Sequence, residues 1–199
     1  MSGAFPISTA KFETLGIKSI QNTIISKSDS GKKLARQIDG QRWAFTARII
    51  TAKRSDVYGD LMAFIVKQRS GKENFTITPP EVQDARGTES GTPHGTAIAG
   101  ATSVTLGGTG TGTLEAGDFI KFANHDKVYM VVADQSDIST GTLTIEPPLT
   151  TAVSSSNISY DSVPFTVYLT SDIQEFGTVG ADSSGNVLYQ YEFDVEEAL

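Results

Sequence analysis

The composition of the chain changes abruptly at residue 83 and changes back at residue 163. Residues 83–162 are rich in Gly, Thr and Ser and hold only three basic side chains, whereas both flanking segments have conventional strand texture. Prolines lie close to both boundaries of this segment, in Pro79-Pro80 before it and in Val163-Pro164 after it. This pattern predicts a discontinuous fold: a β-rich core made by residues 1–82 and 163–199, with a small self-contained β module at 83–162 inserted into it.

The flanking segments alternate between apolar and polar residues, which is typical of half-buried strands. In residues 41–50, Trp43, Phe45 and Ala47 fall on one face. Further strands are predicted at 14–27 (one strand or a bent pair, with Ile17, Ile20 and Ile24 as candidates for its buried face), 32–39, 73–78, 163–170 and 187–196. The strand at 32–39 ends in Asp39-Gly40, a strong turn signal.

One helix is predicted at residues 55–70. Ser55 is a candidate N-cap, and Leu61, Phe64 and Ile65 form an apolar stripe at helical spacing. Gly71 is the expected end of the helix. The module contributes four short β signals, at 102–108, 118–123, 127–134 and 141–149, with loops expected at 86–97 and 107–113. The fold class is therefore mainly β with one α-helix.

Charge is divided unevenly along the chain. Residues 1–82 carry 13 basic and 7 acidic side chains, and residues 83–199 carry 3 basic and 16 acidic ones, so the two parts have net charges of +6 and −13. Opposite surfaces of this kind favour head-to-tail contact between copies, although uneven use of solvated charge gives the same composition. The cluster Glu192, Asp194, Glu196 and Glu197 is either a self-repelling soluble end or a face matched to a neighbour. The candidate interface residues are Lys32, Lys33, Arg36, Arg42, Glu192, Asp194 and Glu196.

No pattern in the sequence indicates a catalytic, metal or cofactor site. The Gly-rich run at 107–113 leads into a turn and a strand rather than the helix that phosphate binding requires. His94 and His125 lie in expected loops, and no Ser occupies a nucleophile-elbow pattern. The absence of Cys excludes disulfides and thiolate sites. A pI near 4.8 argues against tight binding to a phosphate backbone.

Three segments resemble a known family when taken in order. SGKK at 30–33, RQIDGQRWAF at 36–45 and FIVKQRSG at 64–71 are similar to the N-terminal core of distal tail proteins of long-tailed bacteriophages and of related minor tail-tip proteins of lambda-like phages. PFTV at 164–167 and YQYEF at 189–193 look like the strand pair that completes that core. The resemblance implies a tail-tube-like β-barrel or split-barrel core, and the inserted segment is similar to small β modules found in phage tail proteins.

The resemblance also implies a function. Such proteins form a hexameric ring at the distal end of the tail tube, and the ring joins the tube to the tail-tip hub and fibres around a central channel for DNA. We therefore expect a structural virion protein in the tail, made in the host cytoplasm, that contacts copies of itself, the tail-tube protein, and hub and fibre proteins. DNA would pass without specific binding. No catalysis, no cofactor and no membrane segment are expected, because no apolar run approaches the ~20 residues that span a bilayer.

Two other functions remain open at this point. A tail-tube or tail-terminator subunit would share the core fold but stack or cap the tube. Alternatively, the inserted module is a carbohydrate- or receptor-binding unit whose ligand face contains Phe119, Phe122 and Tyr129. The competing interpretation of these three aromatic residues is that they fill the core of the module.

Overall fold

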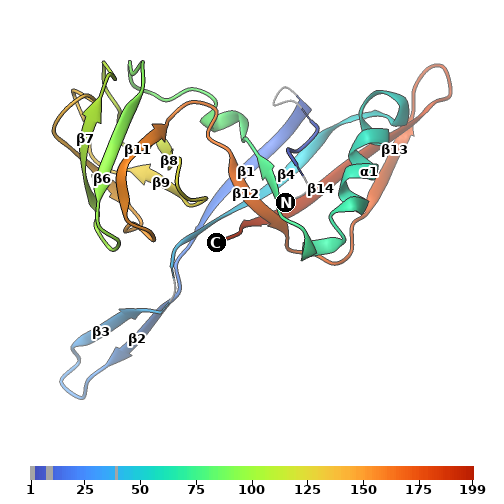
Figure 1. Ribbon diagram of the computed structural model, residues 1–199. Coiled ribbons are helices and arrows are strands. Elements are labelled where there is room, and N and C mark those ends of the chain that lie inside the picture. Colours follow the sequence, from blue (N-terminus) through green and yellow to red (C-terminus); the bar gives the residue numbers. More distant parts are fainter. Residues whose placement is uncertain (1–2, 8–10, 39) are drawn as a thin grey trace.

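The computed structural model describes residues 3–7, 11–38 and 40–199, and it consists of an open sheet with one helix, a closed barrel and a projecting hairpin (Figure 1). The strands of the open sheet are β1 (Phe12–Ile20), β4 (Arg42–Lys53), β5 (Phe75–Ile77), β12 (Phe165–Leu169), β13 (Phe176–Ala181) and β14 (Val187–Glu197). Those of the barrel are β6 (Pro93–Ala97), β7 (Ser103–Gly108), β8 (Phe119–Phe122), β9 (Val128–Val131), β10 (Thr142–Glu146) and β11 (Val153–Ser159). The hairpin is β2 (Thr23–Lys27) with β3 (Lys33–Gln37).

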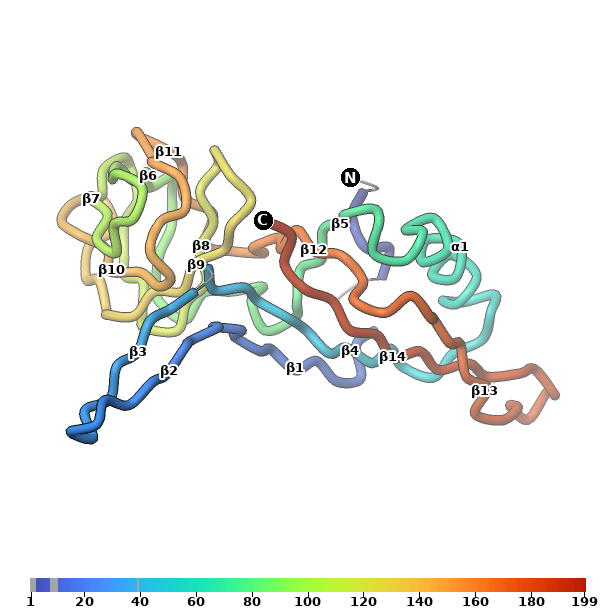
Figure 2. The backbone as a smooth tube through the Cα atoms, turned by 90° about the horizontal axis from the view of Figure 1, so that it is seen from below, coloured from blue at the N-terminus to red at the C-terminus, as the bar shows by residue number. Residues whose placement is uncertain are grey.

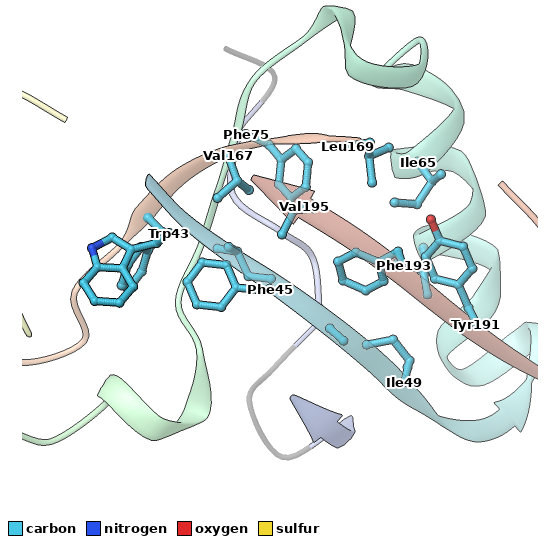
Figure 3. Close-up of a cluster of buried hydrophobic side chains, with 14 of the residues drawn as sticks. Trp43, Phe45, Ile49, Ile65, Phe75, Val167, Leu169, Tyr191, Phe193 and Val195 are labelled. Carbon is cyan, nitrogen blue, oxygen red and sulfur yellow. The ribbon is translucent and has the colours of Figure 1, made fainter. Parts of the chain in front are cut away.

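The open sheet is organised around its two longest strands. Its order is β1-β4-β14-β12-β5, with β13 paired to β14, and every pairing is antiparallel. The predicted alternation in β4 is confirmed, because Trp43, Phe45 and Ala47 are all buried. The partners of this face come from β14, where Phe193 lies opposite Ala47 and Val195 lies opposite Phe45. Residues far apart in the sequence therefore build one apolar face (Figure 3).

Helix α1 (Gly59–Lys67) covers this apolar face with the buried residues Leu61 and Ile65 of the predicted stripe, while Phe64 is partly buried against the same core. Ile65 lies over the sheet residues in Figure 3. Its ends differ from the expectation. A π-helical turn, η2 (Arg54–Tyr58), leads directly from β4 into α1, so Ser55 is not a cap and its hydroxyl donates to the Asp56 carboxylate instead. The α-helix ends at Lys67, and short 3₁₀ turns follow at η3 (Ser70–Lys72) and η4 (Pro80–Val82).

The barrel closes in the order β10-β7-β6-β11-β8-β9, again with antiparallel pairs. Two of its strands, β6 and β11, were not predicted. The sequence of β6 is PHGTA, in which Pro and Gly weaken the strand signal. The glycine is required by packing: a Cβ on Gly95 would lie 2.7 Å from a Val104 methyl carbon and 2.8 Å from the Phe122 ring. Strand β13, within 171–186, was also missed.

The hairpin β2–β3 projects away from both other parts (Figures 1 and 2). It continues from β1. Of the two alternatives predicted for residues 14–27, one strand or a bent pair, the structure has two consecutive strands, β1 and β2. The expectation that Ile24 faces a core is wrong, since its side chain is more than half exposed. Asp39, in the predicted turn at the base of the hairpin, lies outside the described residues. We call residues 23–37 the arm.

The predicted fold class, mainly β with one helix, is confirmed in the described residues. The fully closed barrel belongs to the segment at 83–162, whereas the core strands form an open sheet whose main path runs from β1 to β5. No barrel strand pairs with a strand of the open sheet anywhere in the described ranges. The two parts therefore meet through side chains.

Phe45→Ala tests the apolar face directly. Phe45 is 1% exposed and its ring packs edge-on against Phe165, with ring centroids 4.8 Å apart. The substitution should lower the free energy of unfolding by about 3–5 kcal/mol, because it leaves a cavity between β4 and β12. Denaturant unfolding followed by Trp43 fluorescence measures it. Val66→Ala is the control: that side chain is 73% exposed on α1, so a change within about 0.5 kcal/mol is expected. Equal losses in both variants would contradict the assigned core.

Candidate assembly surfaces

The arm exposes apolar side chains on both of its faces. All ten strand residues of β2 and β3 are exposed, and Ile24, Ile25 and Leu34 are each more than half accessible. Ile25 lies opposite Ala35 on one face, while Ile24 and Leu34 lie on the other. A two-stranded hairpin without a packed face is marginally stable in water. An exposed apolar hairpin of this kind is therefore typical of a segment that packs on another molecule.

The arm is also basic. Residues 23–37 contain four basic side chains, Lys27, Lys32, Lys33 and Arg36, against the single acid Asp29. Lys27 and Lys33 lie directly opposite each other near the tip, and like charges in that arrangement repel. An acidic surface approaching the tip would remove this repulsion. Three of the candidate interface residues, Lys32, Lys33 and Arg36, thus lie together on the arm.

The acidic candidates lie on the outer face of the open sheet, which α1 does not cover. Glu192, Asp194 and Glu196 alternate along β14, so all three point to this face. Arg42 binds Glu196 of its own chain, with 2.6 Å between Nη1 and Oε1. Asp194 accepts a hydrogen bond of 2.5 Å from the Thr46 hydroxyl. The structure therefore joins Arg42 to the acidic set and separates both from the arm.

Sequence reasoning missed a buried polar cluster where the barrel meets the sheet. Lys127 lies just before β9, and its ammonium is 2.5 Å from Glu197 Oε2 and 2.9 Å from Gln41 Oε1. The Lys127 and Glu197 side chains are 2% and 0% exposed. The sequence places Glu197 in a cluster of acids expected at the surface, and the structure corrects this placement because Glu197 is buried. The period of two along β14 was the available signal, because it places Glu197 on the inward side with Val195.

Backbone groups complete this cluster, which we call the junction. Glu197 accepts hydrogen bonds from the backbone N–H groups of Trp43 (3.1 Å) and Val128 (2.9 Å). The Trp43 indole donates to the Val128 carbonyl over 2.9 Å. Burial lowers the pKa of Lys127, and the adjacent Glu197 carboxylate opposes that shift. Removing one member of a buried pair of this kind costs about 3–5 kcal/mol, since the other charge is left uncompensated.

The three aromatic residues proposed as a ligand face occupy packed positions. Phe122 and Tyr129 are completely buried in the barrel core. Phe119 is partly buried and packs edge-on against Trp43, with ring centroids 5.1 Å apart. This placement corrects the expectation that they face a ligand: in this structure they fill the barrel core and the contact between barrel and sheet.

His125 belongs to a polar network at one end of the barrel. Its Nε2 lies 2.7 Å from the Tyr129 hydroxyl, which in turn lies 3.0 Å from Thr150 Oγ1. Its Nδ1 lies 2.9 Å from Asn124 Oδ1. Desolvation by burial lowers the pKa of His125; Lys121 and Lys127 add to the decrease and Asp126 opposes it. The network is connected through buried Tyr129, so its evident role is to hold the turn at residues 123–127.

The other chemical options find no support in the geometry. In the part of the chain that the structure describes, no three His, Asp or Glu side chains are grouped so as to hold a metal ion. His94 is separate from His125 and lies over Gly107, whose missing Cβ makes room for the ring. None of the described helices has the length and apolar character needed to cross a membrane.

Residues 82–161 match the family model for the B domain of distal tail protein pb9. The match covers 80 of the 199 residues and includes every barrel strand, from β6 to β11. It confirms the resemblance to phage distal tail proteins through this part of the chain, and its ends lie one residue from the predicted module boundaries of 83 and 162. A comparison with curated proteins found no match.

The lowered pKa of His125 generates a pH prediction. A histidine whose pKa is depressed by folding contributes stability that is complete above its unfolded pKa, near 6.5, and is lost as the pH falls through the folded pKa. Thermal unfolding at about pH 7.5 and about pH 5.5 should show a larger loss of stability in the parent chain than in His125→Gln. Tyr129→Phe is the control: it loses the hydroxyl contact but keeps the titrating ring, so it should retain the parent's pH dependence. An unchanged pH dependence in His125→Gln would contradict the assignment.

Proposed function

We propose that this chain is a structural subunit of a phage tail that assembles head to tail into a closed ring, a hexamer, at the distal end of the tail tube. The ring joins the tube to the tail-tip hub and fibres and leaves a central channel for DNA. The subunit has no catalytic role and needs no cofactor. The match of residues 82–161 to a distal tail protein domain supports the location in the tail.

The observation that carries the ring proposal is the arm. Its strands of five residues each extend about 17 Å at 3.4 Å per residue, beyond the sheet and the barrel. Its apolar side chains are not packed in a core of their own chain, so we take a neighbouring copy of the chain as the partner that covers them. The arm and the surface that receives it are different parts of one chain, and a heterologous contact of this type generates rings when its rotation closes.

Charge complementarity supports the same direction of assembly. The basic arm of one copy can approach the outward acids of another, Glu192 being the most available because Asp194 and Glu196 already have contacts in their own chain. Such rim charges chiefly raise association rates and set the register of the contact. The chain's net charge of −7 also suits a channel, since an acidic wall does not retain DNA by counterion release.

A tail-tube or tail-terminator subunit is the closest alternative within the same class. It would use a similar arm and sheet but would stack into long tubes or cap a tube end. Negative-stain images of the purified protein separate these outcomes, because a distal adaptor gives single closed rings and a tube subunit gives stacks.

Lys33→Glu combined with Arg36→Glu tests the arm. The double substitution should reduce the oligomer mass measured by light scattering at low salt, because the arm loses its positive charge while each chain stays folded. The matched control is Lys67→Glu with Arg69→Glu, which makes the same charge change at the end of α1, away from the arm. An oligomer of parent size in the arm variant would contradict the electrostatic contact. If the parent is monomeric both at low salt and with purified tail-tube protein added, the ring proposal itself fails.

A further inference from the structure

Three separate segments of the chain converge at the junction. Gln41 immediately precedes β4 and Trp43 lies near its start, Glu197 is the last residue of β14, and Lys127 immediately precedes Val128, the first residue of β9 in the barrel. The first two strands belong to the open sheet and the third to the barrel. No strand pairing links the two parts within the described ranges, so directional bonds between them come from side chains: chiefly this buried cluster, with the longer contact from Lys121 Nζ to the Pro164 carbonyl beside it.

Side chains of the open sheet provide hydrogen-bond partners for the first residue of β9, Val128. Strand β10 pairs with β9 at Val131 and Met130, and that ladder does not continue to Val128. The N–H and C=O groups of Val128 are satisfied by the Glu197 carboxylate and the Trp43 indole instead. Buried backbone groups need partners, so the barrel obtains from the sheet the hydrogen bonds that its own strand does not supply.

Apolar side chains pack around the junction and keep it buried. Phe119 packs against both Trp43 and Phe165, with ring centroids 5.1 and 5.7 Å apart. Val128 is fully buried in the same cluster as the core sheet residues, and Met130 packs on it. Apolar contact alone is non-directional and would tolerate many orientations of the barrel. Charge-assisted hydrogen bonds in a site without water are directional, so they select one orientation of the barrel on the sheet.

We propose that the Lys127–Glu197 pair, together with the Trp43 indole, is an orientation latch: it holds the barrel in one fixed orientation on the sheet and, when broken, releases the barrel as a folded body on its connecting segments, 83–92 and 160–164. This proposal is independent of the proposed assembly of subunits into a hexameric ring. Glu197 ends β14, so displacement of that strand end by a partner would open the latch without unfolding either part.

The chain has no cysteine, which makes a direct distance measurement straightforward. Val66 on α1 and Ile98 in the barrel part are both more than 70% exposed, so each can be replaced by cysteine. The two cysteines carry spin labels for distance measurement by pulsed electron–electron double resonance. This labelled chain is compared with Glu197→Ala and with Lys127→Met plus Glu197→Ala, which also removes the stranded cation. Glu196→Gln, one residue away on the outward face, is the matched control.

The latch predicts a single narrow distance in the labelled parent and in Glu196→Gln. It predicts loss of that narrow distance in both Glu197 variants, with the circular dichroism of folded strands retained. A parent-like narrow distance in the double variant would overturn the proposal, because apolar packing alone would then fix the orientation. Global unfolding of the double variant would overturn it as well, since the cluster would then be part of the folding core rather than a latch.

Discussion

The antiparallel pairing of β4 with β14 is the contact on which the rest of the molecule depends. It joins residues 44–53 to residues 188–196, with paired positions 135 to 152 residues apart, and it supplies most of the apolar face that α1 covers. Every other part is arranged around it. Strand β1 extends the sheet on one side and leads into the arm; β12 and β5 extend it on the other and lead into the barrel. The ends of these two central strands also supply Trp43 and Glu197 to the junction.

The sequence predicted the core well where one face of a strand is buried and the other is solvated. Trp43, Phe45 and Ala47 in β4 and the alternation in β14 gave the correct faces, because a period of two is visible without knowing the partner strand. The helix was located from Leu61 and Ile65, but its start was wrong, since a π-helical turn joined directly to β4 leaves no capping signal. Strand β6 was invisible because packing around Gly95 requires a residue that local preference places in turns.

The candidate surfaces were predicted only in part, for a related reason. Composition located the basic and acidic parts of the chain, and the structure divides the basic set: Lys32, Lys33 and Arg36 lie on the arm, whereas Arg42 is bound to Glu196 on the sheet. Glu197 shows the limit of reading charge from composition. It stands among exposed acids in the sequence, yet its carboxylate is buried because its neighbours across the junction, Lys127 and Trp43, are about 70 and 154 positions away.

The pairing of β5 with β12 has an evolutionary consequence. Ile77 lies opposite Phe165, so the chain leaves the core and returns to it at adjacent points. Any domain with neighbouring ends could occupy this position, and a closed barrel is a favourable occupant because it brings no open strand edge. The junction narrows that freedom, because a replacement domain would have to cover the Trp43 ring and offer a cation to Glu197. Related chains that lack the barrel should therefore carry different residues at the positions of Trp43 and Glu197. Gain or loss of the domain should coincide with substitutions at these two positions.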